Sequence, residues 1–134
     1  MNQPASKKGW TLWKAPRSGG AAPTLLLSVQ AGRFRSFALD ANDIYFIDYY
    51  TGLNKISKNG GAVTNIAYAD EPGNFLVADD ERLYWLKDEV LTATCKDGSS
   101  SQALTAETYL TEDLAVDDSG IYWTQFYQVW KIAK

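Results

Sequence analysis

A repeat with a period of about 40 residues is the feature that most limits what this chain can fold into. Three segments share one order of residues: an aspartate and, four residues later, an aliphatic residue, a tyrosine and a large aromatic ring. A partial fourth copy precedes them, since residues 12–26, LWKAPRSGGAAPTLL, resemble residues 53–67, LNKISKNGGAVTNIA. A period of this length indicates a repeat architecture. The aspartates of the three full copies are Asp40, Asp79 and Asp117, and the tyrosines are Tyr45, Tyr84 and Tyr122.

Within each unit the pattern predicts four short β-strands and no helix. In the first full unit, residues 37–40, 44–48, 53–57 and 62–67 form apolar, β-branched and aromatic runs with turn-forming residues between them. No stretch of the chain carries the apolar stripe that an amphipathic helix needs. Four strands repeated at such a period are typical of a β-propeller blade. The predicted fold is therefore all-β, with about three blades of four antiparallel strands, a to d.

The repeated residues have a physical explanation in such a blade. Strand a lines the central channel and is shielded by the neighbouring blades, so it carries small apolar residues. The aspartate that follows begins the a–b turn, where its side chain can accept backbone N–H groups. Strand b then places one large ring in the wedge between blades, and burying such a ring is worth about 1.5–3 kcal/mol. The three rings are Phe46, Trp85 and Trp123.

These units resemble propellers of the YWTD type, as in low-density-lipoprotein-receptor-like modules, and their bacterial TolB-like relatives. The residues that carry the resemblance are LDANDIYFID at 39–48, ADDERLYWLK at 78–87 and VDDSGIYWTQ at 116–125. No copy completes the tetrapeptide, because Tyr-Trp-Thr is followed by Gln125. The resemblance implies blade architecture, and no ligand of the receptor modules is carried over to this chain.

The strand count raises the question of how the ring closes. Residues 1–9 are expected to form a tail and residues 10–134 a partial propeller: strands c and d at 10–28, blades at 35–67 and 75–105, and strands a, b and c at 113–133. Propellers close with about four to eight blades, and unpaired strand edges favour pairing with another chain. We therefore expect a two-fold dimer of six or seven blades, in which the N-terminal strands of one copy complete the C-terminal blade of the other. The chain could instead be cut from a longer propeller. The expected interface residues are Trp10, Trp13 and Trp130.

The composition excludes several kinds of chemistry. The chain has no histidine and one cysteine, Cys95, which removes histidine-dependent nucleophiles, His-ligated zinc, thiolate metal clusters and an intrachain disulfide. We expect no enzyme activity, no cofactor and no metal. The net charge of −3 disfavours nucleic acid as a partner, and no apolar run approaches a membrane span. As written, the sequence reads as cytoplasmic; it would be extracytoplasmic if a signal segment had been removed.

A binding surface is expected where the b–c turns and the d–a connections meet, at the mouth of the channel. Aromatic rings with interspersed charges suit recognition of peptides or sugars, although loop tyrosines can also simply cover strand ends. Arg33, Arg35, Tyr68 and Tyr109 lie in the same connections. The candidate ligand-binding residues at this mouth are Tyr49, Tyr50, Asp70, Glu71, Asp88, Phe126 and Tyr127.

The sequence leaves several functions open. The first is a non-catalytic scaffold or protein-interaction module that self-assembles into a closed propeller. The second is a lectin-like carbohydrate binder, which would need the same ring and charge in every repeat. A propeller enzyme such as a lactonase or lyase is disfavoured by the missing histidines, and fold alone defines no chemistry. A propeller fragment or designed truncation with no function beyond assembly is also compatible with the repeats.

Overall fold

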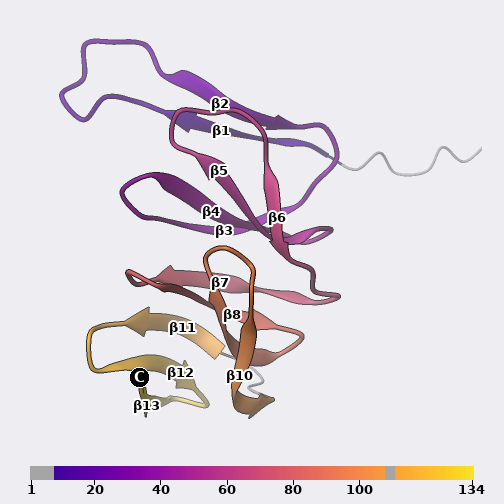
Figure 1. The fold of residues 1–134 in the computed structure, drawn as a ribbon, viewed down its shortest axis with the longest axis vertical. Coiled ribbons are helices and arrows are strands. Elements are labelled where there is room, and N and C mark those ends of the chain that lie inside the picture. The colour runs from indigo at the N-terminus through magenta and orange to yellow at the C-terminus, as the bar shows by residue number, and fades with distance from the viewer. Residues whose placement is uncertain (1–7, 108–110) are drawn as a thin grey trace, which may run out of the picture.

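The computed structural model describes residues 8–107 and 111–134 and contains thirteen β-strands and no helix within them, as the sequence predicts (Figure 1). The strands are β1 (Trp10–Lys14), β2 (Thr24–Val29), β3 (Phe34–Leu39), β4 (Asp43–Asp48), β5 (Gly52–Ser57), β6 (Thr64–Ala67), β7 (Pro72–Ala78), β8 (Arg82–Lys87), β9 (Val90–Cys95), β10 (Ser101–Glu107), β11 (Thr111–Val116), β12 (Gly120–Gln125) and β13 (Gln128–Ala133).

The strands form four antiparallel sheets that follow one another along the molecule (Figure 1). We call them the half-blade (β1–β2), blade 1 (β3–β6), blade 2 (β7–β10) and blade 3 (β11–β13). In each full blade every strand pairs with the next one in the chain, so the order a, b, c, d runs across the sheet. Four-stranded antiparallel sheets repeated in this way are propeller blades.

The a strands begin earlier than their apolar runs predict. β3 starts at Phe34 and β7 at Pro72, one and three residues before the predicted blade boundaries. Each of these strands crosses a register shift, between Phe34 and Ser36 or between Pro72 and Leu76, and then pairs again beyond it. A β-bulge of this kind inserts an unpaired residue and breaks the alternation on which a sequence-based boundary depends.

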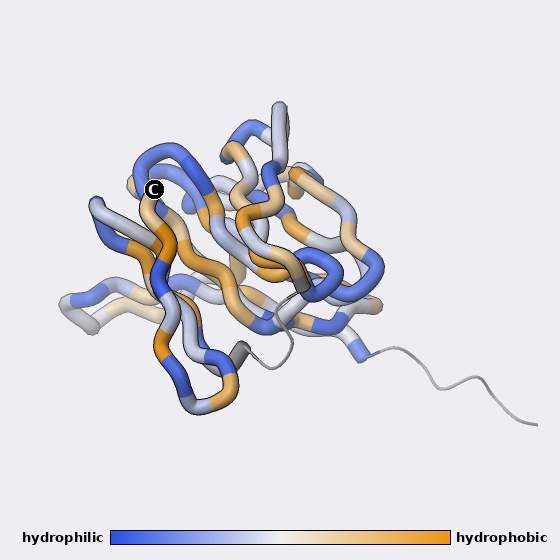
Figure 2. Tube along the Cα trace, turned by 90° about the horizontal axis from the view of Figure 1, so that it is seen from below, coloured by the Kyte–Doolittle hydropathy of each residue, from blue (hydrophilic) through white to orange (hydrophobic). Residues whose placement is uncertain are grey.

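The core lies between adjacent sheets. Trp85 is fully buried against Tyr45 and Leu53 of blade 1, and its indole N–H donates to Thr94 Oγ1 at 2.9 Å. Trp123 packs in the same way against blade 2, and Phe46 packs against the half-blade. The prediction that one ring per blade fills the wedge is confirmed. Figure 2 shows the most hydrophobic segments on the inner strands and the hydrophilic ones at the turns.

Strand β3, in contrast, is less shielded than predicted for a strand a. Phe37 and Leu39 are 50% and 53% exposed. Their face of β3 is turned toward the half-blade, since Phe37 pairs with Phe46, which packs on the half-blade. The half-blade has no a or b strand among the described residues to cover them, whereas the corresponding Leu76 and Leu114 are buried against the preceding blade. On the inner side of the stack β3, β7 and β11 come together and line a shallow apolar hollow.

The inter-blade ring is expected to carry much of the stability. Replacing the fully buried Trp85 by alanine (Trp85→Ala) leaves a large cavity between blades 1 and 2 and should lower the free energy of unfolding by about 3–5 kcal/mol. Urea unfolding followed by far-ultraviolet circular dichroism measures the change. Tyr127→Ala is the control, since Tyr127 is 99% exposed and its removal should shift stability by less than about 0.5 kcal/mol. Equal losses in both variants would contradict the packing described above.

Candidate functional site

The turns and connections that the sequence assigns to a channel mouth lie together at one end of blades 1 and 2, and we call this end the mouth. The b–c turn of blade 1 meets the connection before β3, because the Tyr49 N–H donates to the Arg33 carbonyl at 2.8 Å. The corresponding contact in blade 2 joins the Asp88 N–H to the Glu71 carbonyl at 3.1 Å. The b–c turns and the d–a connections therefore share one end of the blades.

At blade 1 the mouth is a cationic and aromatic cluster. The guanidinium groups of Arg33 and Arg35 lie 5.5 and 5.0 Å from the centre of the Tyr49 ring, within cation–π distance. Arg35 is also anchored to blade 2 by a 2.6 Å hydrogen bond to Asn74 Oδ1, and its Nε is buried without a partner. Tyr50 packs edge-on against Tyr49 and is 40% exposed. One charge, that of Arg33, remains exposed above the tyrosine pair.

At blade 2 the mouth is acidic. Asp70 accepts a 3.0 Å hydrogen bond from the Tyr68 hydroxyl, and Asp88 accepts a 2.8 Å hydrogen bond from the Glu71 N–H. Asp70, Glu71 and Asp88 are all exposed. The structure thus brings these three predicted residues together, beside the cationic cluster of blade 1.

At blade 3 the predicted residues stand apart. Phe126 and Tyr127 form the b–c turn with left-handed φ angles of 52° and 63° and are 57% and 99% exposed. Within the described residues no hydrogen bond or ring contact joins them to the mouth of blades 1 and 2. Tyr109, in the connection before β11, lies outside the described residues.

The three tryptophans predicted at an oligomer interface occupy different surroundings. Trp10 packs edge-on against Phe46, and its indole N–H donates to Asp48 Oδ2 at 2.7 Å, so it already lies inside the chain. Trp130 stacks on Trp123 with ring centres 6.5 Å apart and remains 47% exposed. Trp13 is 56% exposed on the other face of β1. Only Trp13 and Trp130 are therefore accessible to another chain.

A polar contact that the sequence analysis missed joins each blade to the next. In blade 1 the Asp40 carboxylate accepts the N–H groups of Asn42 and Asp43 at 2.9 Å each, as predicted for the a–b turn. Its other oxygen accepts the Tyr45 hydroxyl at 2.8 Å and forms a 3.0 Å ion pair with Lys96 of blade 2. We call this aspartate, tyrosine and following-blade lysine the clasp.

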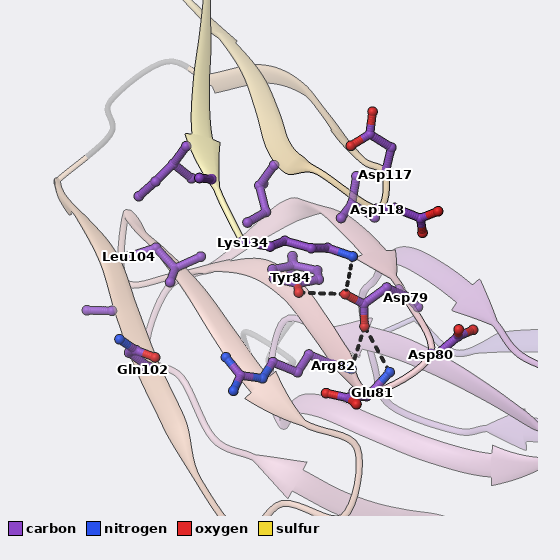
Figure 3. Close-up of a pocket in the computed structure, with 16 residues that line it drawn as sticks. Asp79, Asp80, Glu81, Arg82, Tyr84, Gln102, Leu104, Asp117, Asp118 and Lys134 are labelled. Atoms are coloured by element: carbon purple, nitrogen blue, oxygen red, sulfur yellow. Dashed lines mark hydrogen bonds and ion pairs between the residues drawn. The ribbon is translucent and has the colours of Figure 1, made fainter.

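The clasp is repeated between blades 2 and 3. Asp79 accepts the Tyr84 hydroxyl and pairs with Lys134, with an oxygen–nitrogen distance of 2.7 Å, as Figure 3 shows. The lysine that follows strand c was the available signal, since Lys58, Lys96 and Lys134 recur at equal spacing along the chain.

The clasp sets the protonation of its members. Burial alone would raise the pKa of Asp40, but hydrogen bonds from the Asp43 and Asn42 N–H groups, Lys96 and Tyr45 together hold that pKa well below its usual value. Burial alone would likewise raise the pKa of Asp79, but the hydrogen bonds from Lys134 and Tyr84 outweigh this effect, and the pKa of Asp79 is also lowered. Burial and the adjacent aspartate raise the pKa of Tyr45 and of Tyr84. The clasp is therefore an ionised aspartate bound to a neutral phenol and a cation.

A groove of about 740 Å³ lies beside the second clasp, at the opposite end of the blades from the mouth (Figure 3). It runs between the turn after β7, strand β10 and the turn after β11. Its carboxylates outnumber its cations, and no group of three or more potential metal-ligating side chains occurs in the described part of the chain. The charged residues of the groove are Asp79, Asp80, Glu81, Arg82, Asp117, Asp118 and Lys134.

The fold defines a class: the described residues form a run of β-propeller blades. No family model matches the sequence, and no curated protein does. Among solved structures, a crystal structure of a nidogen/laminin complex has a similar fold, with a TM-score of 0.66 at 20% identity over 78% of this chain and 44% of that chain. The chain thus spans less than half of that relative's length. No helix of the described residues could span a membrane.

The clasp makes the free energy of unfolding depend on pH. A carboxyl group whose pKa is depressed on folding stabilises the folded state above its unfolded pKa, near 3.9, and loses that contribution as the pH falls further. Asp40→Asn should therefore lower the unfolding free energy by about 1–2 kcal/mol at pH 7, with the difference from wild type shrinking toward pH 2. Urea titrations between pH 7 and 2 test this, with Asp118→Asn as the exposed control. A difference that stays constant with pH would show that the charge of Asp40 is not involved.

Proposed function

We propose that the chain is a non-catalytic, protein-binding part of a β-propeller, and that the channel mouth at blades 1 and 2 binds the partner. The observation that carries the proposal is the Arg33–Tyr49–Arg35 cluster, in which one guanidinium is fixed and the other is exposed. The structure of a nidogen/laminin complex is of a propeller-like relative in a protein complex, which is in keeping with such a role.

The chemistry of the mouth favours an extended peptide with an acidic residue. Arg33 can bind a carboxylate through two N–H groups while the Tyr49 and Tyr50 rings supply rigid apolar area. The acidic residues Asp70, Glu71 and Asp88 alongside would repel a second carboxylate and accept a basic group instead. A peptide with separated acidic and basic residues fits this division of charge.

A lectin is less well supported. A carbohydrate site repeated around a propeller needs the same side chains in every blade, but the b–c turns carry Tyr49 and Tyr50 in blade 1 and Asp88 and Glu89 in blade 2. We likewise propose no catalysis, because the chain has no histidine to act as a general base or to activate a nucleophile.

We further propose that two copies associate into one closed ring of six or seven blades. Phe37, Leu39 and Trp13 are exposed at one end of the stack, and Val129 and Trp130 are exposed at the other. Open apolar surface of this kind favours association, and ring closure covers both ends together.

Peptide binding tests the mouth. A library of immobilised peptides that vary in charge is screened with the full chain, and the best binders are measured by biolayer interferometry. Acidic peptides should be enriched, and Arg33→Ala should weaken their binding about tenfold or more. Arg82→Ala, at the opposite end of the blades, is the matched control and should have no effect. Binding that is insensitive to Arg33, or a hit on a glycan array without peptide binding, would overturn the proposal.

Light scattering tests closure. One copy has a mass of 14.9 kDa, and a closed ring of two copies should give twice this mass at micromolar concentration. The measurement should not depend on the peptide. A stable, soluble monomer at that concentration would exclude closure by two copies while leaving the mouth proposal untouched.

A further inference from the structure

The clasp leaves an unmatched aspartate in blade 3. Asp117 accepts the N–H groups of Ser119 and Gly120 and the Tyr122 hydroxyl, as the two complete clasps do. No cation of the described residues forms an ion pair with it, and Tyr122 stays half-buried where Tyr45 and Tyr84 are buried.

The complementary half of a clasp lies in blade 1. Lys58 follows strand c in the same position as Lys96 and Lys134, but it forms no ion pair with any described carboxylate. In the two complete clasps the lysine pairs with the aspartate that follows strand a of the preceding blade. For Lys58 the preceding blade is the one whose c and d strands are β1 and β2. The half-blade has no a or b strand among the described residues. The chain therefore carries one free lysine and one free aspartate of the same contact.

Strands β1 and β13 occupy the same place in the repeat. Trp13–Lys14 and Trp130–Lys131 are identical dipeptides separated by three full repeats. The other two c strands, β5 and β9, have Asn54–Lys55 and Thr92–Ala93 at this position. β1 and β13 are thus the c strands of two blades that stand three repeats apart. If copies join end to end after three blades, β1 of one copy and β13 of the other compete for the same place in one blade.

β13 is less buried than the c strands β5 and β9. Five of its six residues are exposed, whereas β5 and β9 are mostly buried. Its turn places two bulky residues, Phe126 and Tyr127, in the left-handed region, which costs about 1–2 kcal/mol for each residue. The outer edge of β13 has no strand beside it in the described structure.

The groove next to β10 is where the c–d turn of another blade would pack. The c–d turn of blade 2 packs on strand d of blade 1, since a Cβ on Gly98 would lie 3.0 Å from the Ile66 carbonyl oxygen. Gly60 approaches Leu26 of the half-blade in the same way, at 3.9 Å. Gly19, the next member of this series, has nothing within 4 Å, and Leu104, which corresponds to Leu26 and Ile66, lines the open groove.

We propose that two copies of the chain close the ring by strand exchange, in which β1 and β2 of each copy complete the β11–β12 sheet of the other in place of β13. Lys58 of one copy then reaches Asp117 and Tyr122 of the other and completes the missing clasp. Gly19 packs on the other copy's Leu104, and Trp13 takes the position of Trp130 on Trp123. The resulting ring has six four-stranded blades.

This proposal rests on the closure proposed above and specifies its contacts. It also assigns Arg17, which stands in the series of Lys58, Lys96 and Lys134, to Asp79 of the other copy once β13 and Lys134 have moved away. The exchange matches the open contacts of Asp117, Lys58, Gly19 and Leu104 described above.

Charge reversal tests the clasp between copies. Lys58→Glu and Asp117→Lys each place like charges at both contacts of a homodimer and should raise its dissociation constant about 100-fold, measured by analytical ultracentrifugation. Mixing the two variants places opposite charges at both contacts and should restore association as a heterodimer. Asp70→Lys, exposed at the mouth and away from both contacts, is the control and should leave the dissociation constant unchanged within a factor of about three.

Truncation tests which strand is used. Removal of residues 128–134 should leave the dimer intact, since β13 is displaced in it, whereas removal of residues 1–15 should abolish the dimer. A wild-type dimer that tolerates both charge reversals, or that requires residues 128–134, would overturn strand exchange while leaving closure by two copies standing. A wild-type monomer would overturn both.

Discussion

The stack depends on one constraint, which is that every strand b must bind two neighbours at once. Successive residues of a strand point to opposite faces, so in blade 2 Trp85 packs on blade 1 and the adjacent Tyr84 packs on blade 3. The recurring tyrosine-plus-ring pair is thus one contact residue for each side. A change of one residue in the register of strand b would exchange these faces and disrupt both wedges, which explains why the pair recurs while the turns around it vary.

The clasp adds direction to this apolar packing. Hydrophobic contacts between two sheets tolerate sliding, whereas the clasp does not. One carboxylate oxygen of Asp40 binds the hydroxyl of Tyr45 and the ammonium group of Lys96, and the other oxygen binds backbone N–H groups of the a–b turn. The aspartate therefore fixes the a–b turn and the position of the next blade together. Such a contact requires an ionised carboxylate, which the hydrogen bonds secure by lowering the pKa of Asp40 and Asp79.

The strands, the absence of helix in the described residues and the buried rings could be predicted from the sequence, because each depends on local alternation and on a fixed repeat. The lysine of the clasp could not, since Lys96 reaches Asp40 across 56 residues and a lysine after a strand is ordinarily a solvated turn residue. Trp10 shows a second limit of prediction from the sequence. The sequence groups it with Trp13 as an interface residue, but the two lie on opposite faces of β1, across a register shift between Leu12 and Trp13.

The candidate mouth was only partly predictable for the same reason. Loop residues could be assigned to one end of the blades from strand order alone, and Tyr49, Asp70 and Asp88 lie there. The fixed position of Arg35 depends on Asn74 in the following blade, which lies 39 residues away and has no motif to mark it. The left-handed turns at Asp88–Glu89 and Phe126–Tyr127 carry no glycine, so their geometry had no compositional signal.

The two ends of the stack differ, and this decides how copies would meet in the proposed ring. One end is a half-blade with Trp13 exposed, and the other presents Tyr122, Asp117 and an edge strand, so the complementary contact is head-to-tail. Head-to-tail contacts form filaments unless the rotation between copies closes the ring. In the ring proposed above, three of the six blades turn through half a circle, so that a second copy would return to the first. After one exchange the second would be intramolecular, with an effective concentration of about a millimolar, and this favours closure of the pair over the addition of further copies.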